Sequence, residues 1–137
     1  MWLLSNGPNV GDEFVHYYFR PDGTLDRSEI STYGRMIGHF SRFVPVGSVQ
    51  VEANSSDPVV RVAAFERPDG QWVVELLNNR DEAVDVQLQF HDIASAPTRF
   101  TILTSQADSL WQTGQDVALT DLIHLEARSI MTLSGEA

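Results

Sequence analysis

Residues 32–51, TYGRMIGHFSRFVPVGSVQV, decide how this chain is divided. The first half of this stretch repeats apolar residues at steps of three and four, which is the spacing of one face of a helix. Pro45 ends that pattern, because a proline disfavours helical geometry in the residue before it. From Ser48 onward, short apolar segments alternate with turn residues, as in antiparallel strands. The stretch therefore predicts a helix that leads directly into a β-rich region.

The predicted helix runs from about Ser28 to Phe43. Ser28 or Asp26 is expected to cap its first turn, and Glu29 suits the positive end of the helix dipole. The apolar stripe of this helix consists of Ile30, Tyr33, Ile37, Phe40 and Val44.

Two glycines interrupt the predicted helix, Gly34 and Gly38. Each costs about 1 kcal/mol relative to alanine in a helix interior, so a neighbour is expected to pack closely against that side. We therefore expect an interface on this helix, formed by Tyr33, Ile37 and Phe40.

The residues before the helix predict two short strands and a turn. Residues 2–4 form a stub of strand, and Phe14–Phe19 has the β-branched and aromatic content of a strand. Residues 21–23, Pro-Asp-Gly, supply a turn after it.

The region after Ser48 predicts an antiparallel β-sandwich of seven to eight strands, which makes the fold mainly β. Residues 67–70, Arg-Pro-Asp-Gly, are expected to close a hairpin. The expected strands cover residues 49–51, 59–65, 71–78, 84–90, 100–102, 117–119, 122–125 and 129–133.

Composition excludes several classes of partner. The net charge is −10, and all nine basic residues are arginine. Nucleic acids and anionic membrane surfaces need a basic face, so neither is expected as a partner. No apolar run approaches the roughly 20 residues of a membrane span, and residues 1–4 are too short for a signal peptide. Neutral polysaccharide and protein partners stay open, and so does localisation.

Catalytic and metal-binding patterns are not found in the sequence. No Gly-x-Ser-x-Gly elbow occurs, and there is no cysteine. The histidines at positions 16, 39, 91 and 124 have no ligand spacing, so no metal or cofactor is expected. His39 is interpreted as a packed or capping residue. Glu75 lies within residues 72–77, WVVELL, and is interpreted as an outward strand residue.

Aromatic side chains are the better candidates for sugar contact, because a ring packs on the C–H face of a pyranose. Trp72 shares a face with Val74 and Leu76, which favours core packing. Trp111 follows a polar segment and is expected to be partly exposed. Trp111 is therefore a candidate substrate-binding residue.

Several segments, in this order, resemble glycoside hydrolase family 30 in its xylanase-type branch. They are residues 22–25 (DGTL), 38–49 (GHFSRFVPVGSV), 62–65 (VAAF), 68–70 (PDG), 72–79 (WVVELLNN) and 127–133 (ARSIMTL). The resemblance implies that residues 1–46 are the end of a (β/α)8 barrel, with its last strand, a loop and its helix. Residues 47–137 would be the appended β-sandwich domain.

The same resemblance implies that this chain has no catalytic residue. The family places its catalytic glutamates at the ends of the fourth and seventh barrel strands, and this chain resembles the family only from the eighth. Trp2 would correspond to an aromatic that lines the glycone subsite. A secreted parent enzyme is compatible with the family. The family sandwich also uses strands from before the barrel, which predicts an open sheet edge here.

Three functions follow as hypotheses. The first is a non-catalytic accessory sandwich that braces a glycosidase barrel through Tyr33, Ile37, Phe40 and residues 14–19. The second is a stand-alone carbohydrate-binding module that uses Trp111. The third is an interaction domain that shares only the sandwich. Exposed apolar residues and an open edge also predict self-association into a homodimer or larger assembly.

Overall fold

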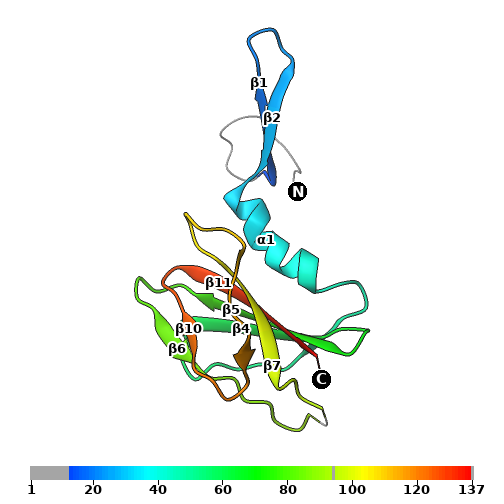
Figure 1. Cartoon of the computed structure of the whole chain (residues 1–137), viewed down its shortest axis with the longest axis vertical. Coiled ribbons are helices and arrows are strands. Elements are labelled where there is room, and N and C mark those ends of the chain that lie inside the picture. Colours follow the sequence, from blue (N-terminus) through cyan, green and yellow to red (C-terminus); the bar gives the residue numbers. More distant parts are fainter. Residues whose placement is uncertain (1–12, 94, 137) are drawn as a thin grey trace. The chain divides into compact units, whose positions relative to one another are not determined.

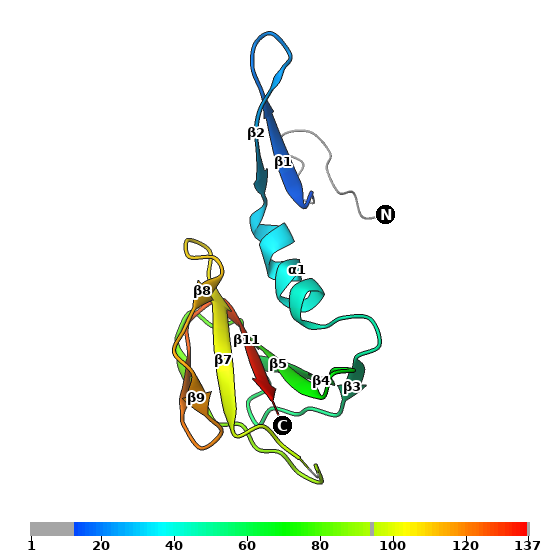
Figure 2. The same cartoon turned by 45° about the vertical axis from the view of Figure 1, so that its right-hand side comes forward.

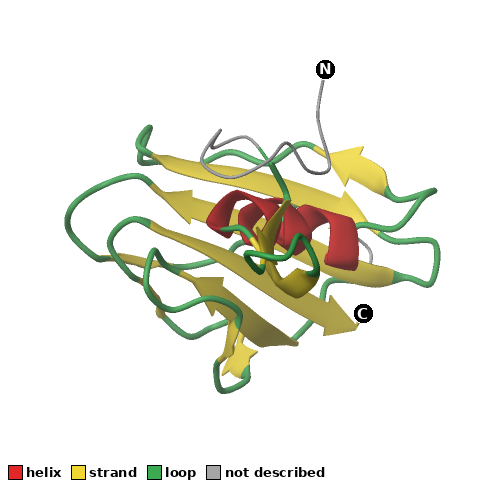
Figure 3. Cartoon of the chain, turned by 90° about the horizontal axis from the view of Figure 1, so that it is seen from above, coloured by secondary structure: helices red, strands yellow, loops and turns green. Residues whose placement is uncertain are grey.

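The computed structural model describes residues 13–93 and 95–136 (Figure 1). Strands dominate these residues, and α1 (Thr32–Phe43) is the one helix among them (Figure 3). No helix in the described ranges is long and apolar enough to cross a membrane. The chain divides into two compact units, with the boundary between Gly38 and His39 inside α1.

The first unit contains an antiparallel hairpin of β1 (Val15–Phe19) and β2 (Leu25–Ile30). Its register pairs Val15 with Ile30 and shifts at a bulge between Tyr18 and Phe19. The predicted turn is confirmed: Gly23 adopts φ 82°, and the Asp22 carboxylate accepts a hydrogen bond from the Thr24 N–H at 2.9 Å. The Thr24 hydroxyl donates to the same carboxylate at 2.7 Å, and this bond, together with the one from the N–H, lowers the pKa of the Asp22 carboxyl group.

The predicted helix start at Ser28 is wrong. Residues up to Ile30 belong to β2, and α1 begins at Thr32. The N-terminal cap is Ser31, whose Oγ accepts a hydrogen bond from the Gly34 N–H at 2.9 Å. The same hydroxyl donates to the Glu13 carbonyl at 2.6 Å. Ser31 therefore satisfies an orphan helix donor and ties the cap to the segment before β1.

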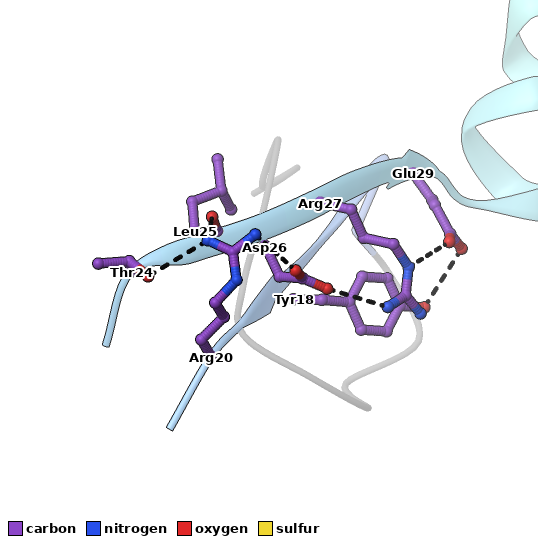
Figure 4. A network of polar contacts seen from close by, with 7 residues as sticks. All are labelled: Tyr18, Arg20, Thr24, Leu25, Asp26, Arg27 and Glu29. Atoms are coloured by element: carbon purple, nitrogen blue, oxygen red, sulfur yellow. Dashed lines mark hydrogen bonds and ion pairs between the residues drawn. The ribbon is translucent and has the colours of Figure 1, made fainter. Parts of the chain in front are cut away.

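Polar cross-strand contacts explain why residues 25–30 pair as a strand (Figure 4). The Arg27 guanidinium lies 3.8 Å from the centre of the Tyr18 ring and pairs with Glu29 at 2.7 Å. Arg20 pairs with Asp26 at 2.9 Å. Glu29 and Asp26 thus pair with arginines and do not cap the start of the helix. Exposed pairs of this kind add little to stability, because solvent screens them.

Gly34 meets the expectation of a close neighbour. A Cβ built on it would lie 2.5 Å from the carbonyl oxygen of Phe14. Real Cβ atoms do not approach a backbone oxygen so closely, so only glycine fits at this turn of the helix. The adjacent Tyr33 ring stacks on Phe14, with 5.5 Å between the ring centroids.

The second unit is a β-sandwich, which confirms the predicted fold class. Its large antiparallel sheet has seven strands among the described residues, in the order β3-β4-β5-β11-β7-β8 with β9 also on β7. These strands are β3 (Val49–Val51), β4 (Val60–Glu66), β5 (Gln71–Asn78), β7 (Arg99–Ser105), β8 (Gln112–Thr113), β9 (Val117–Ala118) and β11 (Ser129–Glu136). The small sheet pairs β6 (Val84–Val86) with β10 (Ile123–Leu125).

Alternation along the central strands gives the large sheet two different faces. The inner face packs against the small sheet and forms the apolar core, with Leu133, Phe100 and Leu125 at most 1% exposed. The outer face carries Glu75 from β5 and Thr132 from β11, which are register partners. The C-terminal end of α1 lies on this outer face, because His39 hydrogen-bonds Thr132 (Figure 2).

The predicted strand at residues 84–90 ends early, at Val86. Leu88 and Phe90 still pack against the core. Phe90 stacks on Phe100 at 6.1 Å and meets the edge of Trp72 at 5.5 Å. The alternation of this segment therefore reports burial, although strand pairing stops after three residues.

Candidate functional site

Four buried side chains form a continuous chain of hydrogen bonds on the outer face of the large sheet. Thr132 Oγ1 donates to Glu75 Oε2 at 2.8 Å and lies 2.7 Å from His39 Nδ1. The other ring nitrogen, Nε2, lies 2.8 Å from Ser105 Oγ. Ser105 Oγ in turn accepts the backbone N–H of Trp111 at 2.8 Å. We call Glu75, Thr132, His39 and Ser105 the buried polar chain.

Four different elements supply this buried polar chain, namely β5, β11, α1 and β7. His39, Ser105 and Thr132 are fully buried, and Glu75 is 3% exposed. Inaccessible polar groups must find partners within the protein, and these four find them largely in one another. One oxygen is the exception: Glu75 Oε1 has no hydrogen-bond partner among the described residues.

Burial shifts both titratable groups toward their neutral forms. It raises the pKa of Glu75 to about 8, against the opposing effect of the Thr132 hydrogen bond. It lowers the pKa of His39 to about 4. At neutral pH the pair is therefore a carboxylic acid and a neutral imidazole, separated by a threonine hydroxyl.

A serine next to a histidine raises the question of nucleophilic catalysis. Ser105 is closed to solvent, so no substrate can reach its hydroxyl. The histidine is also oriented by Thr132 and not directly by a carboxylate, so it lacks the charge stabilisation of a hydrolytic triad. The arrangement is suited to holding α1 on the sheet.

The interpretation of Glu75 as an outward residue is wrong. Its side chain does leave the apolar core, as the alternation predicts, but the outer face is covered and Glu75 is only 3% exposed there. The interpretation of His39 as a packed residue is confirmed. Sequence alone missed Ser105 and Thr132, because a hydroxyl inside an apolar strand is a common feature.

The tryptophans fall into three situations. Trp72 is 4% exposed, which confirms core packing. Trp111 is half-buried at φ 54°, and the Arg42 guanidinium lies 5.6 Å from its ring centre. The expectation of partial exposure is thus confirmed, while a sugar-binding role for Trp111 stays a prediction. Trp2 lies outside the described residues.

The three residues predicted as an interface differ in their surroundings. Phe40 is 38% exposed and meets the edge of Phe65, with 6.4 Å between the ring centroids. Ile37 is 40% exposed, and Tyr33 is half-buried. The stripe therefore keeps exposed apolar surface, and its role as an interface stays a prediction.

Two open grooves lie on the second unit. One, of about 510 Å³, is lined by Phe43, Arg67, Arg99, Asp116 and Glu136 among others. The other, of about 480 Å³, is lined largely by neutral polar residues including Gln106, Gln112 and Thr113. Within residues 13–93 and 95–136, no three histidine or acidic side chains gather into a metal-binding group.

Comparison with known proteins agrees with this architecture. Residues 47–133 match the glycosyl hydrolase family 30 beta sandwich domain. The chain belongs to glycosyl hydrolase family 30. The matched residues begin just after α1 and end within β11, so the family 30 assignment rests on the sandwich.

Family 30 relatives are much longer than this chain. It is 29% identical over 102 residues to a lysosomal acid glucosylceramidase of Mus musculus, covering 71% of this chain and 20% of that protein. It is 32% identical over 108 residues to the glucuronoxylanase XynC of Bacillus subtilis, covering 75% of this chain and 25% of that protein. The chain thus spans about a fifth to a quarter of these relatives.

Solved family 30 structures share the fold. The catalytic domain of xylanase C from Talaromyces cellulolyticus superposes with a TM-score of 0.76 at 21% identity, covering 96% of this chain and 29% of that one. An endoxylanase from Clostridium papyrosolvens superposes with a TM-score of 0.72 at 22% identity. The superposition covers 79% of this chain and 28% of the endoxylanase chain.

Proposed function

We propose that this chain is a non-catalytic accessory sandwich that braces the catalytic barrel of a glycosidase in polysaccharide degradation. The observation that carries the proposal is the match of residues 47–133 to the family 30 sandwich. The burial of Glu75 and His39 supports it, because the most strongly perturbed titratable groups of the described chain lie where no substrate reaches them.

The partner that we propose is a family 30 barrel, contacted through the exposed apolar residues of α1. Ile37 and Phe40 present apolar surface that a soluble protein usually covers in an interface. The hairpin adds Phe19, Leu25 and Ile30, which are 63%, 50% and 46% exposed.

Two assays test the proposal. Incubation of the chain with xylan, β-glucans, galactans and aryl glycosides should release no sugar above buffer. Turnover that disappears when a single glutamate of this chain is changed to glutamine would refute the non-catalytic role.

The bracing role is tested by mixing the chain with a family 30 barrel whose own sandwich has been deleted. The chain should raise the thermal midpoint of the barrel, and the double change Ile37→Ser and Phe40→Ser should abolish the effect. The change Ser41→Ala, at an exposed position of the same helix, is the control. No stabilisation by the unchanged chain would contradict the role.

A further inference from the structure

The buried polar chain connects α1 to the middle of the large sheet. His39 is its helical member, and it reaches Ser105 on β7 and Thr132 on β11 through its two ring nitrogens. Thr132 continues the chain to Glu75 on β5. Residues that are 57 to 93 positions apart in the sequence are therefore held together by three side-chain contacts.

The protonation state of this site is restricted by its geometry. One assignment of protons satisfies every link: Ser105 donates to His39 Nε2, His39 Nδ1 donates to Thr132, and Thr132 donates to Glu75. A second proton on His39 would turn Nε2 into a donor and remove the acceptor for the Ser105 hydroxyl. Loss of the Glu75 proton would leave a negative charge on an inaccessible carboxylate whose Oε1 has no partner among the described residues.

We propose that the buried polar chain is a pH-responsive latch that holds residues 39–43 of α1 on the sandwich, strongest in mildly acidic solution and weakened on either side. The latch closes when His39 is neutral and Glu75 is protonated. It is weakened in acid when His39 gains a proton, and in alkali when Glu75 loses one.

Other charged groups lie on the elements that surround the buried polar chain, but they do not determine its pH dependence. On α1 and on the same-facing positions of the neighbouring strands they are mainly arginines, which keep their charge throughout the relevant range. The shifts of His39 and Glu75 both come from burial, and no charged neighbour contributes to either. The charged groups concerned are Arg35 and Arg42 on α1, Arg61 on β4, Arg99 on β7, Asp108 in the following loop and Glu136 on β11.

The two groups have opposite effects on folding stability. The folded pKa of His39, about 4, lies below its ordinary value of 6.5, so His39 contributes stability that is lost as the pH falls from 6.5 toward 4. The folded pKa of Glu75, about 8, lies above its ordinary value of 4.5, so its contribution is lost as the pH rises from 4.5 toward 8. Between pH 4.5 and 6.5 the two effects cancel, so the folding stability has a broad maximum over this range.

Changing one group at a time separates the two slopes. In Glu75→Gln only the His39 slope remains, so the unfolding equilibrium constant should fall about tenfold per pH unit from 4.5 to 6.5 and stay level above. In His39→Asn only the Glu75 slope remains, so this constant should rise about tenfold per unit from pH 4.5 to 8. In the unchanged chain the unfolding equilibrium constant should stay level up to pH 6.5 and then rise about 30-fold by pH 8.

Urea unfolding of the whole chain at half-unit steps from pH 4 to 8 measures these profiles. Glu82→Gln and His91→Asn, at exposed positions, are the matched controls and should reproduce the unchanged chain. A Glu75→Gln profile that runs parallel to the unchanged chain would overturn the proposal. This comparison stands even if His39→Asn does not fold.

A local readout tests whether the end of α1 follows the same pH dependence. The Val44 amide donates to the Phe40 carbonyl at 2.8 Å, so its hydrogen exchange reports the end of α1. After correction for intrinsic rates, its protection should fall about 30-fold between pH 6.5 and 8 in the unchanged chain and stay level in Glu75→Gln. Equal protection at both pH values in the unchanged chain would overturn the latch.

Discussion

Replacement of Thr132 by valine tests the buried polar chain most directly. Valine has the shape of threonine and suits a strand, so the change removes the hydroxyl and little else. Thr132 is fully buried between β5 and β7, and no solvent can take over its contacts. The substitution therefore isolates the worth of two hydrogen bonds, one to His39 and one to Glu75.

The expected loss follows from what the change leaves unpaired. His39 Nδ1 and Glu75 Oε2 would each lose a partner, at about 1–3 kcal/mol for a buried polar group. The added methyl group returns about 0.8 kcal/mol of apolar burial. We expect a net loss of about 1–5 kcal/mol in the free energy of unfolding. A domain of ordinary stability has only about 5–15 kcal/mol, so this is a large fraction of it.

Urea denaturation at pH 5.5, followed by tryptophan fluorescence, measures the loss. Thr101→Val, at an exposed position of β7, is the matched control and should stay within about 0.5 kcal/mol of the unchanged chain. Adding Glu75→Leu to Thr132→Val removes one of the two polar groups that Thr132→Val leaves without a partner. The double variant should therefore lose less stability than the sum of the two single losses. A loss below about 1 kcal/mol for Thr132→Val would show that the chain contributes little to stability.

Three further outcomes are expected. Gly135→Ala should destabilise the sandwich by about 1–3 kcal/mol in urea, because the new Cβ would lie 2.6 Å from the Arg99 carbonyl oxygen; an unchanged midpoint would contradict this contact. Light scattering over a range of concentrations should show a homodimer or larger assembly, which Phe40→Ser should weaken; a strict monomer at every concentration would argue against the exposed stripe as an interface. Titration calorimetry with xylo- and gluco-oligosaccharides should show weak binding at most, whereas micromolar binding abolished by Trp111→Ala would favour a carbohydrate-binding module.

Much of the fold could be predicted from the sequence because local signals and burial agree in the sandwich. The hairpin around residues 67–70 joins β4 to β5 as expected, with Glu66 opposite Trp72. The start of α1 could not be predicted in the same way. Residues 28–30 fit the apolar period of a helix, but the pairing of Tyr18 with Arg27 and of His16 with Glu29 draws them into a strand. Tertiary pairing overrides the local pattern there.

The buried polar chain shows why alternation alone mispredicts Glu75. Period-two alternation says which face of a sheet a residue occupies, but it does not say whether that face meets water. In this chain the outer face meets the end of α1, and the residue that faces Glu75 across the strand is a threonine bonded to His39. A carboxyl group at the centre of β5 is compatible with the fold because Thr132 donates a hydrogen bond to it, and His39 at the end of α1 completes the hydrogen bonding of Thr132.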